Sequence, residues 1–165
     1  MSDLGFLSPS RATDEAVWRS PVERALAHAP AGIEDVSRTG KLEVRGDLTG
    51  SEASGFESVR LTARRALVLC TWEETTALRA RLRGEGLQVV DQSAGYAGLR
   101  VQGATLMRRL TDLDLDRLPA AGALAHVPAI VLRDDERTFR VFVPQEYGHY
   151  VAEVVVDAAQ GVAAQ

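Results

Sequence analysis

The sequence is poor in the residues that cross-link small proteins or coordinate metals. Cys70 is the single cysteine of 165 residues, which excludes a disulfide framework and a cysteine metal cluster. The 3 histidines lie far apart, without metal-ligand spacing. Lys41 is the single lysine, a bias typical of genome composition rather than of function. The net charge of −4 disfavours a nucleic-acid surface, which is normally basic.

Long apolar segments and a leader are also lacking. No window approaches the roughly 18 apolar residues of a membrane span, and the first residues show no basic start followed by an apolar run. We therefore expect a cytoplasmic protein with no membrane segment and no bound nucleic acid. At this length roughly 70% of the surface of the unfolded chain can be buried, so no covalent or metal cross-link is required.

What the sequence does contain is one short phrase written twice. Residues 35–46 (DVSRTGKLEVRG) and 91–103 (DQSAGYAGLRVQG) both read Asp-x-Ser and then Leu-x-Val-x-Gly. In each copy two apolar residues alternate with polar ones such as Lys41 and Glu43, which predicts a half-buried strand with its polar side in solvent. We expect four residues of these strands to point into the core: Leu42, Val44, Leu99 and Val101.

The rest of the chain alternates between helix and strand patterns. Ser20, Pro21 and Glu23 predict a helix start, with Ser20 as the cap and Glu23 closing a capping box. The unbroken apolar run 66–70 predicts a strand covered on both faces. Other strands are expected at about 57–63, 87–90, 129–132 and 139–143, a loop at 47–55, and helices at 71–83, after Gly103 and at 145–159. The buried face of the last helix is predicted to hold Tyr147, Tyr150, Val151, Val154 and Ala158.

The two halves follow one plan. Each runs strand, hairpin and helix, which predicts an internally duplicated α+β fold with helices packed on largely antiparallel sheet. We expect a flexible N-terminal arm at 1–18 and a single domain at 19–160. Its pseudo-repeats are expected at about 33–86 and 87–160, the second with one additional helix.

Local motifs identify no self-sufficient active site. Asp35 with Ser37, and Asp91 with Ser93, are typical of turns that enter a strand, and the alternative is a paired polar site facing a ligand. The acidic stretch 112–116 lacks the glycine and the bidentate acid of a calcium loop. Phosphate-cradling glycine loops and a Gly-x-Ser-x-Gly elbow are missing from the sequence.

Longer stretches resemble a known group of proteins. VVDQSAGYAGLRVQG, LTDLDL and HVPAIVLRDDERTFRVFVPQEYGHYVAEVVVDA resemble the gamma subunit of heterotetrameric sarcosine oxidase. GIEDVSRTGKLEVRG is similar to the opening phrase of the glycine-cleavage T-protein, the folate-dependent aminomethyltransferase to which that subunit is related. The resemblance covers residues 19–158 in outline, and it implies two intertwined ferredoxin-like subdomains of β-β-α-β-β type around a folate-binding-domain fold.

The resemblance also implies an accessory role. In sarcosine oxidase the gamma subunit packs beside larger subunits that hold the flavins, so flavoprotein subunits are the expected partners and the expected site of any flavin. Arg38-Thr39 stands where the T-protein phrase has His-Met, and Leu99 where a second T-protein phrase has an acid. We therefore expect a chain that is not catalytic alone, within a sarcosine or amine oxidase complex linked to folate one-carbon metabolism.

Two alternatives stay open. In the first, the chain is a stand-alone folate-binding module or a reduced aminomethyltransferase that binds tetrahydrofolate. Tyr96 would then stack on the pterin and Arg133 would pair with the glutamate, whereas the simpler interpretation makes Tyr96 a core residue and Arg133 a turn residue. In the second alternative, the chain forms a purely structural homodimer.

Overall fold

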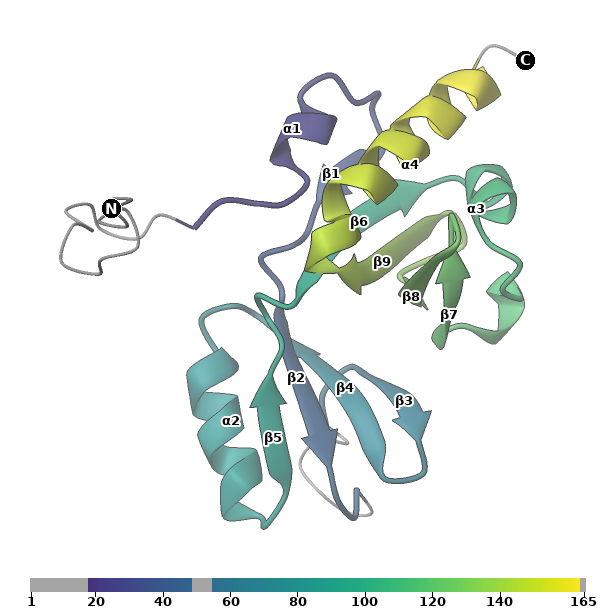
Figure 1. Cartoon of the computed structure of the whole chain (residues 1–165). Coiled ribbons are helices and arrows are strands. Elements are labelled where there is room, and N and C mark those ends of the chain that lie inside the picture. Colours follow the sequence, from purple (N-terminus) through teal and green to yellow (C-terminus); the bar gives the residue numbers. More distant parts are fainter. Residues whose placement is uncertain (1–17, 49–54, 164–165) are drawn as a thin grey trace, which may run out of the picture.

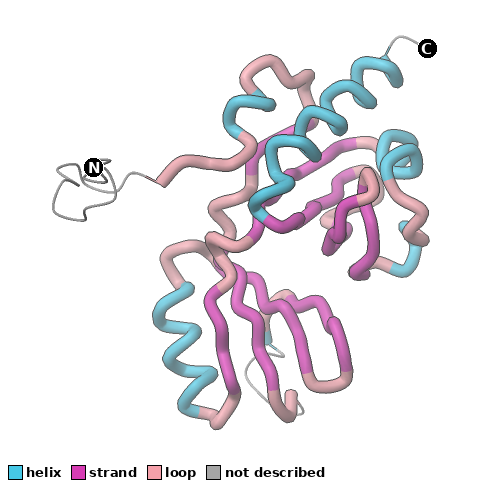
Figure 2. The backbone as a smooth tube through the Cα atoms, viewed as in Figure 1, coloured by secondary structure: helices cyan, strands magenta, loops and turns pink. Residues whose placement is uncertain are grey.

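The computed structural model describes residues 18–48 and 55–163. These residues form two antiparallel sheets, each covered on its outer side by helix, and the chain crosses from one sheet to the other twice, once in each direction (Figures 1 and 2). We call the part built on the 4-stranded sheet the smaller lobe and the part built on the 5-stranded sheet the larger lobe.

The smaller lobe contains one helix and one sheet. Its elements are β2 (Gly40–Arg45), β3 (Ser58–Thr62), β4 (Arg65–Cys70), α2 (Thr75–Gly84) and β5 (Gln88–Asp91). The strand order is β3-β4-β2-β5. Helix α2 lays Leu78 and Leu82 onto Leu42, Val44 and Val68 of the sheet, and this contact forms the core of the lobe.

The larger lobe contains the remaining elements. They are α1 (Glu23–Leu26), β1 (Ile33–Asp35), β6 (Tyr96–Gln102), α3 (Ala104–Leu110), the 3₁₀ turn η4 (Leu115–Arg117), β7 (Ala120–Leu124), β8 (Val127–Arg133), β9 (Thr138–Pro144), the 3₁₀ turn η5 (Gln145–Tyr147) and α4 (Gly148–Ala163). The strand order is β1-β6-β9-β8-β7. Helices α1, α3 and α4 cover the outer face of this sheet (Figure 1).

The two lobes exchange strands. Strand β1 leaves the first copy of the repeated phrase to pair with β6, so that Asp35 lies opposite Leu99. Strand β5 does the reverse and pairs with β2, so that Asp91 lies opposite Leu42. Each Asp-x-Ser strand therefore pairs with the Leu-x-Val strand of the other copy, and the predicted duplicated, intertwined α+β fold is confirmed.

Two reciprocal hydrogen bonds fasten the exchange. Ser37 Oγ accepts the N–H of Gly98 at 3.0 Å, and Ser93 Oγ accepts the N–H of Lys41 at 3.0 Å. Gly98 and Lys41 occupy the same place in the two copies, one residue before the shared leucine. Because each serine bonds the partner phrase rather than its own, the two hydrogen bonds are related by the same internal symmetry as the strands.

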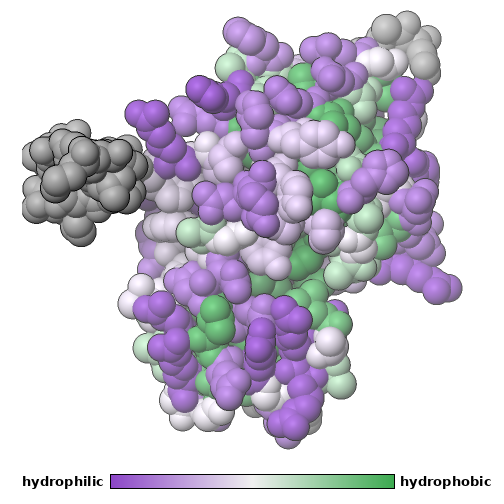
Figure 3. All heavy atoms as spheres, viewed as in Figure 1, coloured by the Kyte–Doolittle hydropathy of each residue, from purple (hydrophilic) through white to green (hydrophobic). Residues whose placement is uncertain are grey.

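The inner faces of the two sheets pack on each other. Strands β3 and β4 contribute Val59, Leu67 and Leu69, and β8 and β9 contribute residues that include Phe142. The layers therefore run from α2 through the two sheets to the helices of the larger lobe. Figure 3 shows one face of this arrangement, where hydrophilic residues dominate and apolar residues show between them, mainly over the larger lobe.

Most element predictions are confirmed. Leu42, Val44, Leu99 and Val101 are all buried, and β4 is buried on both faces. Helix α2 buries Leu78 and Leu82 as expected, and α3 follows Gly103. The sequence did not predict strands β1 and β7.

The prediction that Lys41 and Glu43 face solvent is wrong. Their exposed fractions are 0% and 3%. Alternation along β2 does put Leu42 and Val44 on the α2 side, but the larger sheet covers the opposite side as well. A period-2 pattern distinguishes the two faces of a strand and cannot tell which packing partner lies beyond the polar face.

The predicted inner face of the last helix is also wrong in part. Tyr147 and Tyr150 are 44% and 48% exposed, whereas Val151 is buried as predicted, together with Ala152 and Val155. Tyr147 belongs to η5, a 3₁₀ turn with about three residues per turn, so a face counted at 3.6 residues per turn from this tyrosine is rotated away from the core.

The first helix starts later than the predicted Ser20 cap implies. It comprises Glu23–Leu26 with Val22 at the cap position and no side-chain cap hydrogen bond there, so the predicted capping box of Ser20 and Glu23 is wrong. Ser20 Oγ instead accepts the N–H of Val22 at 3.3 Å, one turn before the helix. Residues 1–17 of the predicted arm and 49–54 of the predicted loop lie outside the described residues.

Candidate functional site

The inner face of β2 carries a buried amine. Lys41 Nζ donates to the carbonyl oxygens of Ser37 at 2.8 Å and Thr39 at 2.7 Å, and it lies 5.3 Å from the ring centre of Phe142. These acceptors and the ring face supply a partner for each ammonium proton. Burial lowers the pKa of Lys41 to about 8, against the opposing effect of nearby carboxylates, chiefly Asp91.

Glu43, two residues after Lys41 on the same strand, is a buried carboxylate. Glu43 accepts two parallel hydrogen bonds from Arg65, at 2.9 and 2.8 Å, and a third from Arg45. These hydrogen bonds, above all those from Arg65, hold the pKa of Glu43 below its usual value despite burial. A fully buried lysine and glutamate on one strand are uncommon in proteins, and titratable groups of this kind concentrate at functional sites.

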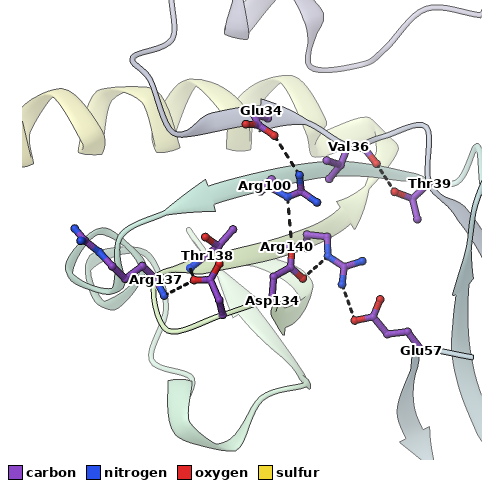
Figure 4. Close-up of polar contacts among 10 residues, drawn as sticks. Glu34, Val36, Thr39, Glu57, Arg100, Asp134, Arg137, Thr138 and Arg140 are labelled. Carbon is purple, nitrogen blue, oxygen red and sulfur yellow. Dashed lines mark hydrogen bonds and ion pairs between the residues drawn. The ribbon is translucent and has the colours of Figure 1, made fainter.

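A second polar cluster lies between the two sheets (Figure 4). Arg140 of β9 donates from Nε to Asp134 at 2.6 Å and from Nη2 to Glu57 of the smaller lobe at 2.5 Å. Arg100 extends the chain of charges, because it contacts Asp134 and also Glu34 of β1. Arg140 is only 14% exposed, whereas its partner Glu57 is 46% exposed, so this network joins the two lobes at the edge of the inter-sheet interior.

A shallow groove runs beside this cluster. It is about 470 Å³ in volume and is lined by residues of both lobes, among them Arg38, Trp72 and Arg140. The guanidinium of Arg38 lies 5.9 Å from the ring centre of Trp72. The ring of Trp18 packs on that of Trp72, with 6.0 Å between the two ring centres. Trp18 is 43% exposed, so the cluster of Trp18, Arg38 and Trp72, here called the tryptophan patch, is open to a partner.

The two predicted folate residues do not come together. Tyr96 packs at the inter-sheet core, where burial raises the pKa of its phenol, and it lies opposite Pro144 at the start of β6. Arg133 stacks 5.4 Å from the ring centre of Phe139, which belongs to the outer-face core, and lies opposite Phe139 in the sheet. The two side chains are therefore at opposite ends and on opposite faces of the larger sheet.

The other sequence candidates have structural roles. Asp35 and Asp91 each accept the N–H of the serine two residues later, at 2.8 and 2.9 Å, which is the predicted turn geometry. Burial raises the pKa of the Cys70 thiol, which disfavours its nucleophilic form. Among residues 18–48 and 55–163, no group of three histidine, cysteine or acidic side chains could hold a metal, and no helix is long and apolar enough to cross a membrane.

Sequence reasoning missed Lys41, Glu43 and the tryptophan patch. Lys41 is the single lysine, but the rarity of a residue type does not indicate whether its side chain is buried. The patch joins residues 18, 38 and 72, which share no motif, so only the fold brings them into contact.

These features define a duplicated α+β fold of the T-protein type, with exchanged strands and a polar interior between the sheets. The chain shares this fold with a chain of the heterotetrameric sarcosine oxidase from Corynebacterium sp. U-96 in complex with pyrrole 2-carboxylate. The two superpose with a TM-score of 0.74 and 21% identity over 91% of this chain and 98% of that one.

Two further solved structures share the fold. The glycine cleavage system aminomethyltransferase T from Bartonella henselae matches with a TM-score of 0.58 and 16% identity, over 86% of this chain but only 52% of that protein. The regulatory subunit of aspartate kinase from Thermus thermophilus matches with a TM-score of 0.52 and 13% identity, over 78% of this chain and 97% of that one. No family model and no curated protein matches the sequence.

Proposed function

We propose that this chain is an accessory, gamma-like subunit of a heteromeric sarcosine or amine oxidase linked to folate one-carbon metabolism. The observation that carries the proposal is one of coverage. The chain accounts for 98% of a chain of heterotetrameric sarcosine oxidase but for only about half, 52%, of an aminomethyltransferase. It therefore corresponds to a whole subunit of the first enzyme and to a fragment of the second.

The chemistry of the described residues supports an accessory role. The buried charges at Lys41 and Glu43 have protein partners and do not line the groove. The tryptophan patch, in contrast, presents tryptophan and arginine, two of the residue types that dominate binding energy at protein interfaces. Flavoprotein subunits are the proposed partners, the cytoplasm is the proposed location, and any flavin would be held by the partners.

The test is co-purification from the cells that encode the chain. A tagged wild-type chain is expected to bring down flavoprotein subunits, detected by flavin absorbance and by mass spectrometry. Trp72→Ala is expected to weaken the association about tenfold or more, as loss of an interface tryptophan does. Tyr150→Ala removes an exposed aromatic residue on another element and serves as the matched control. Repeated recovery of the chain alone, without flavin, rejects the proposal.

A second candidate function is folate binding by the isolated chain. It rests on the shared fold with an aminomethyltransferase and on Tyr96, which is partly exposed at the sheet junction and close enough to Glu43 and Arg65 to feel their charges. Calorimetry with tetrahydrofolate tests it. Tyr96→Leu tests the proposed pterin contact and Arg133→Gln the proposed glutamate contact, and since the two side chains lie on opposite faces of the sheet, only one of the two changes should weaken binding. Absence of heat at millimolar tetrahydrofolate rejects this candidate.

A further inference from the structure

The internal duplication gives the protein two equivalent hollows, one at the far end of each lobe. In the smaller lobe the hollow lies where β2 ends and where β4 and β5 begin, the lower end of that lobe in Figure 1. In the larger lobe it lies where β6 ends and β9 begins. Their volumes are close, about 520 and 540 Å³.

The backbone of the two hollows is the same. The glycine that ends the repeated phrase has a positive φ in both copies, 142° for Gly46 and 113° for Gly103. Each glycine donates its N–H to the arginine at the hairpin turn, Gly46 to the Arg64 carbonyl at 3.0 Å and Gly103 to the Arg137 carbonyl at 2.7 Å. The side chains of the two hollows can therefore be compared position by position.

The side chains differ in charge. Arg45 pairs across the sheet with Arg65, whereas the equivalent pair in the larger lobe is Gln102 with Thr138. With Arg64, the hollow of the smaller lobe is lined by three arginines and no acid, while that of the larger lobe holds one arginine and one aspartate. Two arginines directly opposite each other in a sheet repel. Because the larger lobe forms the same backbone with Gln102 and Thr138, the backbone does not require arginine at these two positions.

Glu43 explains how two of the arginines are held. It accepts hydrogen bonds from Nε and Nη2 of Arg65 and from Nε of Arg45, which fixes both guanidinium groups, and both arginines also line the hollow with donors to spare. Arg64 has no ion pair or hydrogen bond from its side chain with any described residue. One buried carboxylate thus contacts two of the three arginines, and the side chains that line the hollow are otherwise basic or neutral.

We propose that this hollow, lined by Arg45, Arg64 and Arg65, binds a small oxyanion carrying two negative charges, either a dicarboxylate or a phosphate. Guanidinium forks match the oxygen geometry of both groups, and fixed forks lose little entropy on binding. The proposal does not depend on the proposed function, because it rests on the comparison of the two hollows alone.

The test is calorimetric titration of the full chain with inorganic phosphate and, separately, with glutarate, at constant ionic strength set by sodium chloride. Wild-type protein is expected to bind at least one of the two probes saturably, and the stronger of the two identifies the preferred oxyanion. Arg64→Ala, an exposed side chain outside the core, should weaken that binding about tenfold, the loss of one charge-assisted contact. Arg137→Ala, the equivalent change in the other hollow, should leave it unchanged.

Three results would overturn the proposal. They are no saturable heat with either probe above the chloride background, equal binding by wild type and Arg64→Ala, and equal weakening by Arg64→Ala and Arg137→Ala. Thermal unfolding of both variants without probe shows whether they are folded. If Arg64→Ala is not folded, Arg64→Gln takes its place with the same expected loss.

Discussion

At the interior that the two lobes share, equivalent positions carry side chains that differ in size or in charge. Lys41 of the smaller lobe corresponds to Gly98 of the larger, and Glu43 corresponds to Arg100. Lys41 places its amine over Phe142, and the same ring fills the space beside Gly98, where an added Cβ would lie 2.8 Å from it. The interior between the two lobes therefore has room for a large side chain at position 41 or at position 98, but not at both.

The second pair of positions is inverted in charge. Glu43 lies among arginines, with Arg45 and Arg65 as partners, whereas Arg100 lies among acids, with Glu34 and Asp134. Glu43 is buried and therefore requires its partners, whereas Arg100 is 40% exposed and pairs with acids at the edge of the interior. The comparison teaches that duplication preserved the backbone and the strand exchange, while the interior side chains became specialised in each copy.

The largest effect is expected from the shared core. Val44 and Val101 are both 0% exposed and occupy equivalent places. Val44→Ala and Val101→Ala should each lower the free energy of unfolding by about 2 to 4 kcal/mol, the cost of a core cavity. Urea unfolding measures both, with exposed Val90→Ala as the control. A severe effect in one lobe and none in the other would break the structural equivalence.

Gly98→Ala is expected to cost about 3 kcal/mol, the upper end of the range for overpacking. The new Cβ would meet the Phe142 ring at 2.8 Å and the carbonyl oxygen of Val36 at 2.8 Å, and backbone cannot yield as a flexible side chain does. Gly84→Ala is the control, since nothing lies within 4 Å of its added Cβ. Equal stability of the two variants in urea would show that the interior is not shared in this way.

The lysine that replaces Gly98 in the other copy should make stability depend on alkaline pH. Burial lowers its folded-state pKa to about 8, from the 10.5 of an exposed lysine, despite the opposing effect of Asp91, Asp35 and Cys70 nearby. Between these values the unfolded chain holds the proton and the folded chain does not, so stability rises with pH. Below pH 8 both states are protonated, and the full cost of burying the charge remains.

Lys41→Met isolates this contribution. Relative to the variant, wild type should gain about 2 kcal/mol of unfolding free energy between pH 8 and pH 10, from a linkage of about 1.4 kcal/mol per pH unit. Urea unfolding at several pH values measures the difference in unfolding free energy between the two proteins. The contributions of the other titrating groups, which both proteins share, cancel to first order in this difference. Parallel pH profiles for the two proteins would contradict a depressed pKa at Lys41.

The smallest effect is expected from the reciprocal serine bonds. Ser37→Ala leaves the Gly98 N–H without its acceptor, and Ser93→Ala does the same to the Lys41 N–H. Each change should cost about 1 to 2 kcal/mol, the penalty for an unsatisfied buried donor. Exposed Ser58→Ala is the control. Costs that differ by more than about 1 kcal/mol would show that the two crossings are not equivalent.

Much of the fold could be predicted from the sequence, because its strands and helices have clear periods. The burial of Leu42 and Leu99, the helix after Gly103 and the hairpin before Thr138 all follow from local pattern. Strand β1 is only three residues long, and β7 reads Ala-Ala-Gly-Ala-Leu, without the β-branched or aromatic residues that mark a strand. Neither carries a signal that local rules can detect.

The candidate sites were less predictable, for a different physical reason. The burial of Lys41 and Glu43 depends on a second sheet contributed by distant residues, and the arginine hollow joins 45, 64 and 65 through strand pairing. Tyr96 and Arg133 were selected by residue type alone, and their assignment to folate stays a prediction. Only the turns at Asp35 and Asp91, which depend on neighbours in sequence, were assigned correctly from local chemistry.

Native-state hydrogen exchange of the Lys41 and Gly98 amides tests the strand exchange most directly. Each amide donates to a serine of the other copy, so neither hydrogen bond can open while both lobes stay intact. We predict that both amides exchange only through global unfolding and report the same opening free energy, equal to that from urea. Opening of one amide at a free energy several kcal/mol below the other would show that one lobe unfolds alone, and would contradict the intertwined duplication.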